Sequence, residues 1–228
     1  MGRKRSAPTP APTPTPSPTV LSGTEGNDSL MWESPAAGTV DGRGGFDTLT
    51  ISLGGLTTDL VMTGALGSGA TALLSTGLTI QNIELLRIRS GGGNDRLFGG
   101  AGDDYFATGI GNDSVAGGGG NDWLDLAQGD NVASGGAGAD TFFLLHDGKV
   151  TITDFSVDQG DKILFDINGL DIPTAWGIAN GFIRITDSKA GAVLEVDFDG
   201  SSTAFDWSVV AVLQGVSAAS LIPEAFAA

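Results

Sequence analysis

The chain has 228 residues, a formal net charge of −16, no cysteine, one histidine and 37 glycines. Without cysteine there is no disulfide framework and no thiolate metal site, and one histidine cannot build a multi-histidine zinc centre. The negative charge argues against nucleic acid or an anionic membrane as a partner, because phosphate recognition depends on lysine and arginine. Only 5 of the 27 acidic residues are glutamate, and aspartate beside abundant glycine is typical of turns rather than helices.

Residues 1–20 are predicted to form a Pro/Thr-rich, disordered linker. Proline occupies every second position from Pro8 to Pro18, and alternating proline fixes φ and removes N–H donors, which favours an extended spacer. Two interpretations stay open, a stalk that holds the folded part away from a surface and a plain disordered tail. The basic cluster at Arg3 to Arg5 is not followed by an apolar segment, so we do not expect a cleaved secretory signal. No run approaches the ~18 apolar residues that a membrane span needs.

Residues 21–50 contain two degenerate turns. Asp28 and Asp47 each follow a glycine by five residues and precede a leucine by two. The two aspartates are 19 residues apart, one more than the 18 residues that two nine-residue units span. We therefore predict that the register breaks here, leaving a frayed first coil with Trp32 in its loop.

Residues 51–89 are predicted to form a β-rich spacer with a structural role. Short apolar runs rich in Leu and Ile recur through it, among them Leu78 to Ile80 and Ile83 to Ile88. Runs of this length and composition favour strands over helices.

Residues 90–143 divide into six nine-residue units without an insertion. The units read SGGGNDRLF, GGAGDDYFA, TGIGNDSVA, GGGGNDWLD, LAQGDNVAS and GGAGADTFF. Position four is always glycine, position eight is always apolar, and position six is aspartate in every unit except the fifth, which has Asn131. A flexible glycine-rich linker would not keep aspartate and an apolar residue in phase over six periods.

This pattern, G-G-x-G-x-D-x-U-x, resembles the repeats of the RTX (repeats-in-toxin) family, a calcium-binding β-helix repeat. The resemblance implies an all-β fold, a right-handed parallel β-roll over residues 90–145 in which two nonapeptides complete one coil and calcium ions lie between stacked turns. The chemistry agrees with it. Glycine permits positive φ and close approach of carbonyl groups, and aspartate supplies the hard oxygen that Ca²⁺ prefers. Three stacked turns on each edge of the roll leave two gaps between them, and the array is therefore expected to hold about three to four Ca²⁺ ions.

Alternate units lie on opposite edges of such a roll, and the two edges differ in quality. Units two, four and six match the motif without a fault, so Asp104, Asp122 and Asp140 are expected to form the strong row. Asp95 and Asp113 provide a further site on the other edge, where Asn131 is a defective position. The full candidate calcium set also includes Asp154 and the turn residues Gly91, Gly93, Asn94, Gly99, Gly100, Gly102, Asp103, Gly109, Gly111, Asn112, Gly117, Gly118, Gly120, Asn121, Gly135, Gly136 and Gly138.

Residues 146–228 resemble the carboxyl-terminal cap of RTX proteins. The resemblance rests on an I-x-D-F stretch around Asp154 and a G-D-K-I stretch around Asp161, and it implies that Asp154 closes the last coil. We expect Asp158 and Asp161 to lie in a solvated turn. The final residues, 221–228, are similar to the uncleaved signal of type I secretion substrates, which implies the type I secretion machinery as a partner and an extracellular or cell-surface location.

We expect no intrinsic enzyme. The chain lacks the H-E-x-x-H zinc motif and the G-x-S-x-G nucleophile elbow, although an unrecognised active site within residues 51–89 stays a weaker alternative. Tyr105 and Trp123 are one coil apart and face outward, which suggests a sugar-stacking or partner-binding patch. The equally open alternative is that both pack under the cap or the spacer.

The sequence thus predicts an extracellular calcium-binding RTX protein that folds on Ca²⁺ after type I secretion, as a structural or adhesive surface protein. Polysaccharide, a cell surface or a second copy of the chain are the partners considered. The alternative is a secretion and folding module of a larger effector or of a polysaccharide-acting enzyme.

Overall fold

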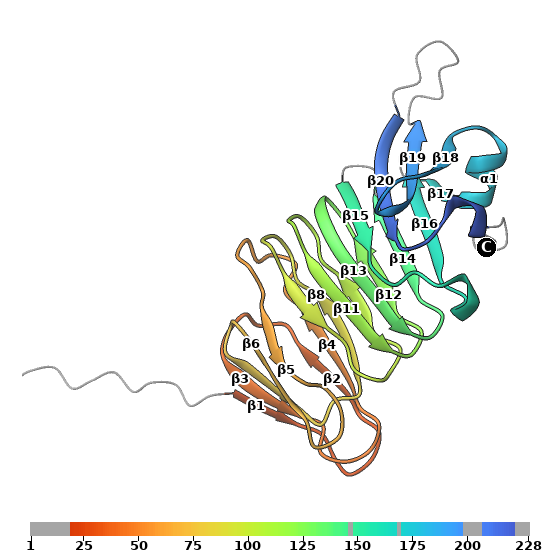
Figure 1. Ribbon diagram of the computed structural model, residues 1–228. Helices are drawn as coiled ribbons and strands as arrows, with labels where there is room; N and C mark the ends of the chain where they lie inside the picture. The colour runs from red at the N-terminus through yellow and green to blue at the C-terminus, as the bar shows by residue number, and fades with distance from the viewer. Residues whose placement is uncertain (1–18, 146–147, 168–169, 198–206, 222–228) are drawn as a thin grey trace, which may run out of the picture.

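The computed structural model describes residues 19–145, 148–167, 170–197 and 207–221. The fold is almost entirely β, with strands stacked along one axis (Figure 1). Helix is confined to α1 (Thr174–Ala179) and two 3₁₀ turns (Val157–Gln159 and Ala218–Ser220) in the described chain. The predicted linker lies outside these residues as far as residue 18, and its last two residues already belong to β1.

One wall of the roll is an eight-stranded sheet in the order β17-β16-β14-β12-β10-β8-β4-β2. Its strands are β2 (Ser29–Trp32), β4 (Thr48–Ser52), β8 (Leu85–Arg89), β10 (Tyr105–Ala107), β12 (Trp123–Leu126), β14 (Thr141–Leu145), β16 (Lys162–Ile167) and β17 (Leu170–Pro173). Neighbours from β2 to β16 are parallel, and only β17 is antiparallel. Tyr105 pairs with Trp123, and Trp123 with Thr141, so two nonapeptides complete one coil, as predicted.

The facing wall consists of two sheets that follow one another along the axis of the roll. The first has the order β1-β3-β7-β6-β5, and the second β18-β19-β20-β15-β13-β11-β9. The first contains β1 (Thr19–Ser22), β3 (Gly38–Asp41), β5 (Met62–Gly64), β6 (Thr71–Leu74) and β7 (Leu78–Gln81). The second contains β9 (Arg96–Phe98), β11 (Ser114–Gly119), β13 (Gly129–Ala137), β15 (Gly148–Ile152), β18 (Ile183–Asp187), β19 (Gly191–Asp197) and β20 (Trp207–Gln214). A parallel bridge between Val61 and Arg96 joins the two.

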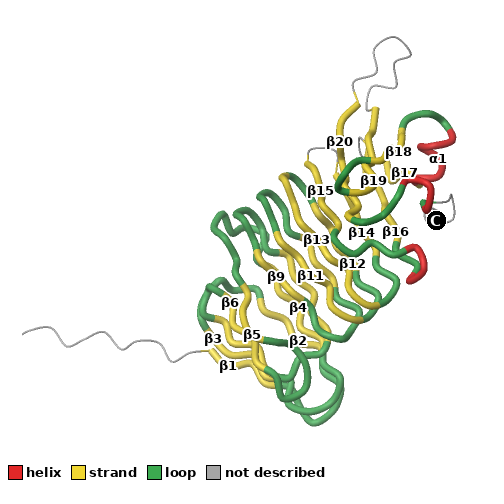
Figure 2. Tube along the Cα trace, in the orientation of Figure 1, coloured by secondary structure: helices red, strands yellow, loops and turns green. Residues whose placement is uncertain are grey.

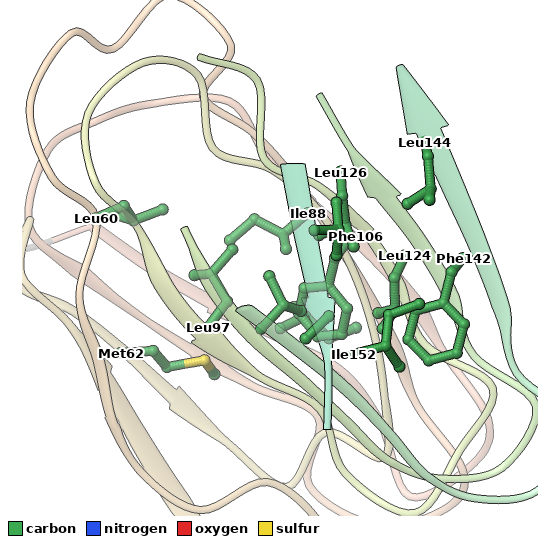
Figure 3. Packing of buried hydrophobic residues seen from close by; sticks show 14 of the residues in the cluster. Leu60, Met62, Ile88, Leu97, Phe106, Leu124, Leu126, Phe142, Leu144 and Ile152 are labelled. Carbon is green, nitrogen blue, oxygen red and sulfur yellow. The ribbon is translucent and has the colours of Figure 1, made fainter. Parts of the chain in front are cut away.

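The core lies between these walls. Successive strand residues point to opposite faces, and the apolar position eight of each repeat points inward, where all six side chains are at most 2% exposed. Phe106, Leu124 and Phe142 are paired in register and form a buried column, which Figure 3 shows against Leu97 and Ile152 from the opposite wall. Each buried side chain of this size contributes about 1.5–3 kcal/mol of transfer free energy.

The first coil keeps its register, which makes the predicted fraying wrong. Both walls advance by the same 19 residues, because Thr19 pairs with Gly38 in one and Ser29 with Thr48 in the other. Because the coil is one residue longer on both walls, its inward side chains stay aligned with those of the next coil. The hydrogen bonds between the paired strands are therefore kept. Trp32 is the last residue of β2 rather than part of a loop. It is buried, and its indole N–H donates to the Ser34 carbonyl at 2.5 Å.

The roll also continues through the predicted spacer. From residues 51–89, β7 joins β3 and β8 joins β4, both in parallel. The inserted strands β5 and β6 extend the wall beyond β7 as an antiparallel pair. The eight-stranded sheet therefore crosses the limits at residues 50 and 89 without a break.

The C-terminal end is closed by antiparallel strands. β15 and β16 still extend the two parallel walls, and β20 pairs in parallel with β15. Antiparallel β17 and the β18–β19–β20 set then cover the end, which shields strand edges that would otherwise stay unpaired. Within the described ranges no helix is long and apolar enough to cross a membrane. Residues 222–228, most of the predicted secretion signal, lie outside the described residues.

Candidate calcium sites

A row of acidic residues follows one edge of the eight-stranded sheet. An acidic residue immediately precedes each of its parallel strands, namely Asp28, Asp47, Glu84, Asp104, Asp122, Asp140 and Asp161. The main-chain N–H of Asp104 donates to Asp122 Oδ1 at 2.8 Å, and that of Asp122 to Asp140 Oδ1 at 2.9 Å. Each carboxylate is thus held by the preceding coil, and the predicted strong row stands in one column. Figure 2 shows the turns along both edges of the stacked strands.

A second, shorter row lies on the other edge. Asp95 N–H donates to Asp113 Oδ1, and Asp113 N–H to Asn131 Oδ1, both at 2.8 Å. Asn131 therefore keeps the ladder bond, but its second polar atom is the amide Nδ2, which donates to the Ala127 carbonyl at 3.3 Å. An amide nitrogen is no ligand for Ca²⁺, which gives a physical reason for the predicted weakness at this position.

In five of these aspartates the second carboxylate oxygen is buried without a partner, whereas Asp104 Oδ2 accepts Gly100 N–H at 2.6 Å. Oδ2 has no hydrogen bond in Asp95, Asp113, Asp122 and Asp140, and the same holds for Asp47. A buried charged oxygen without a partner is costly. Burial accordingly raises the pKa of Asp122 to about 7 and the pKa values of Asp104 and Asp140 to about 6, with neighbouring carboxylates adding to the rise. Burial also raises the pKa of Asp95 and of Asp113.

Some of these carboxylate oxygens lie, together with main-chain carbonyl oxygens, beside the Cα of a glycine in the turn. A methyl group on Gly117 would overlap Asp122 Oδ2 and the carbonyl oxygen of Gly135 on the next coil. A methyl group on Gly99 would likewise overlap Asp104 Oδ2 and the Gly117 carbonyl. Gly99 and Gly117 thus each leave a cradle lined by oxygen atoms from two consecutive turns.

The cradles fit a calcium ion. Ca²⁺ takes 6 to 8 oxygen ligands, carboxylate and carbonyl alike. In the described part of the chain no three acidic or histidine side chains gather in one group, so each ion would be held by at most two carboxylates together with turn carbonyls. Bound there, the ion supplies the positive charge that the buried Oδ2 atoms lack.

Two further glycine positions set the path of the turn. In the strong row, position two has φ of 115° at Gly118 and 104° at Gly136, and position four has 102° at Gly120 and 128° at Gly138. Side chains rarely adopt such left-handed backbone, whereas glycine does so without a steric penalty. Positive φ also occurs on the second row at Gly91, Gly93, Gly109 and Gly111.

The position-five residues brace the turns on the outside. Asn112 N–H donates to Asn94 Oδ1 at 2.9 Å, and Asn121 N–H donates to Asp103 Oδ1 at 2.6 Å. Asn112 and Asn121 accept in the same way from the next coil. All four side chains are exposed, so they link one turn to the next.

The last coil is closed by two aspartates, of which only one was expected. Asp154 accepts from the N–H groups of Gly135 and Gly136, both at 3.0 Å. The prediction that Asp161 lies in a solvated turn is wrong, because it is 3% exposed and accepts Asp140 N–H at 3.0 Å. The 3₁₀ turn lengthens this coil to 21 residues, so a search in steps of 18 misses Asp161. Its position directly before a strand was the available signal. Asp158 is exposed, as expected.

The predicted aromatic pair is on the outer face of the eight-stranded sheet. Tyr105 and Trp123 are direct neighbours across β10 and β12. Trp123 is 38% exposed and stacks on Phe143 with ring centroids 6.2 Å apart. The Arg89 guanidinium lies 5.9 Å from the centre of the Tyr105 ring.

The fold and the turns together define a parallel β-roll with calcium-type turns. Residues 87–115 and 116–144 match the family model of the RTX calcium-binding nonapeptide repeat (4 copies). The chain therefore contains RTX calcium-binding nonapeptide repeats, and the resemblance noted in the sequence is confirmed for these repeats. No curated protein matches the chain.

Proposed function

We propose that this protein is exported unfolded by a type I system and folds outside the cell when it binds Ca²⁺. The observation that carries the proposal is the row of buried Oδ2 atoms without a partner, since a roll built on them is incomplete until cations arrive. Charge supports the same conclusion. Residues 90–143 contain eight aspartates and a single basic residue, Arg96, so without cations the array repels itself.

Calcium at extracellular concentration supplies enough free energy for such a switch. An ion that binds only the folded form stabilises it by RT ln(1 + [L]/Kd), which is about 1.4 kcal/mol for each site with Kd of ~10⁻⁴ M at ~1 mM Ca²⁺. Consecutive cradles share a turn, because the Gly117 carbonyl belongs to one and Asp122 of the same turn to the next. Sites that share a turn are coupled, so we expect a steep response.

Circular dichroism with and without calcium tests the switch. The purified chain is titrated with Ca²⁺ after chelation, and with Mg²⁺ at equal ionic strength as the control. Mg²⁺ demands tight octahedral geometry and dehydrates reluctantly, so it should not replace Ca²⁺. We expect β structure to rise cooperatively with Ca²⁺ alone. Equal β structure in chelator and in calcium would overturn the proposal.

We further propose that the folded roll acts as a structural or adhesive surface protein. The outer face of the eight-stranded sheet carries Arg87, Arg89, Tyr105 and Trp123. A hollow of about 440 Å³ on this face is lined in part by Arg87, Arg89 and Tyr105. Both arginines are exposed, and within the described residues neither has an acidic side chain within 4.0 Å. Exposed cations beside aromatic rings on a rigid sheet suit contact with a polysaccharide.

Binding of purified, calcium-loaded protein to extracellular polysaccharide tests the adhesive role. Trp123→Ala and Arg87→Gln should each weaken binding at least several-fold. The control, Val132→Ala, removes a 45% exposed side chain from the opposite wall and should bind as the parent does. Export is tested separately by following the protein into the medium of cells with and without a type I exporter. Normal polysaccharide binding by the Trp123 variant would argue against this face.

A further inference from the structure

The turn formed by residues 42–47 repeats the calcium cradle outside the matched repeats. A methyl group on Gly42 would overlap Asp47 Oδ2 and the main-chain carbonyl of Asn82. This is the arrangement at Gly117, where Asp122 Oδ2 and a carbonyl of the next coil converge. The family match begins only at residue 87, so nothing in the repeat pattern assigns an ion here.

The backbone of this turn follows the path of the repeats although the residues differ. Position two is Arg43 with φ of 72°, and position four is Gly45 with φ of 123°. A left-handed arginine is strained, and such strain persists only where the surroundings impose it. Phe46 N–H also donates to Asn27 Oδ1 at 2.9 Å, which is the outer brace seen in the array.

Asp47 is placed like the aspartates of the strong row. It is fully buried, its Oδ1 accepts Asp28 N–H at 2.8 Å, and its Oδ2 has no hydrogen-bond partner. Among the described residues no basic side chain pairs with it. On the neighbouring coil, Asn82 has φ of 51° and its Nδ2 donates to Asp41 Oδ1 at 2.7 Å, which holds its carbonyl toward the cradle.

We propose that Asp47 Oδ2 and the Asn82 carbonyl hold a calcium ion between turn 42–47 and the loop at residues 82–84. The ion extends calcium control from the repeat array into the N-terminal coils. This inference rests on the calcium binding proposed for the array, since both sites use the same chemistry. It concerns a separate site, however, and can fail alone.

Crystals of the unaltered chain grown in Ca²⁺, measured at a long wavelength, give the direct test. We expect an anomalous peak between Asp47 Oδ2 and the Asn82 carbonyl, beside peaks in the array. Array peaks without one at Asp47 would overturn this inference alone. The absence of all peaks would overturn the calcium switch as well.

Ion counting by calorimetry gives a second test in solution. Asp47→Asn keeps the Oδ1 acceptor for Asp28 and removes only the charged oxygen, so the variant should bind one ion fewer per chain. Asp158→Asn, the same change at an exposed position, should bind as many ions as the unaltered chain. Hydrogen exchange of residues 38–52 should lose its dependence on Ca²⁺ in the Asp47 variant only. An unchanged ion count in that variant would overturn the inference.

Discussion

The substitution Asp122→Asn tests the two carboxylate oxygens of the best-formed calcium site separately. Asparagine keeps an Oδ1 that can accept Asp104 N–H, now 2.8 Å away, and replaces the unpaired Oδ2 by an amide donor. Without calcium the change removes a buried charge, so the chain should be no less folded than its parent. With calcium it removes the carboxylate that faces Gly117 and the Gly135 carbonyl.

The expected loss follows from the linkage relation. One site with Kd of ~10⁻⁴ M contributes about 1.4 kcal/mol at ~1 mM Ca²⁺ and about 2.7 kcal/mol at 100-fold excess over Kd. The ratio of folded to unfolded chain at ~1 mM Ca²⁺ should therefore fall about tenfold. A calcium titration followed by circular dichroism measures this as a shift of the folding midpoint to higher Ca²⁺.

Asp103→Asn is the matched control for this experiment. It removes the same charge from the same array, yet Asp103 is exposed and its Oδ1 accepts Asn121 N–H at 2.6 Å, a bond that asparagine can also accept. A midpoint close to that of the parent is expected. If both variants shift the midpoint equally, general charge repulsion explains the effect and the assignment of Asp122 as a ligand is refuted.

Three other changes test the same structure. Lowering the pH from 7.5 to 5.5 should weaken calcium binding, because burial raises the pKa of Asp122 to about 7 and those of Asp104 and Asp140 to about 6, so protons compete for these oxygens. The calcium-free fold should gain stability over the same interval, since a raised pKa means that the folded form binds the proton more tightly; titrations at each pH decide, and a pH-independent midpoint would contradict this. Asn131→Asp should increase calcium uptake on the second row by calorimetry, and an unchanged ion count would contradict it. Phe106→Ala should cost about 3–5 kcal/mol in urea unfolding with calcium present, because this ring is fully buried in the core, and a loss below 1 kcal/mol would contradict the packing.

Strict periodicity explains why the central array could be predicted. A nine-residue phase places position eight inward and position six at the turn in every unit, so the buried column of Phe106, Leu124 and Phe142 follows from counting alone. The strong row is predicted for the same reason. Neighbouring coils of equal length place their aspartates at the same point of the turn.

Coils of other lengths could not be predicted by counting. Asp28 and Asp47 stay paired at a spacing of 19 residues, and Asp140 and Asp161 at 21. The physical constraint in both pairs is that the N–H of the aspartate meets the carboxylate one coil further on, although the coils differ in length. Trp32 was misplaced for the same reason, because a register assumed to be broken gave it no strand.

The two carboxylate oxygens of the aspartates in these rows have different roles, and this difference bears on how folding and calcium binding are linked. Oδ1 accepts a main-chain N–H and needs no charge to do so, since Asn131 accepts Asp113 N–H at the same 2.8 Å that separates Asp95 N from Asp113 Oδ1. In Asp47, Asp95, Asp113, Asp122 and Asp140, Oδ2 is buried without a partner and requires a cation. A coil can therefore keep its register while losing its ion, but it cannot gain an ion before its register is set. Ion binding should follow the stacking of two turns and then stabilise it, so that each new cradle depends on the coil beside it.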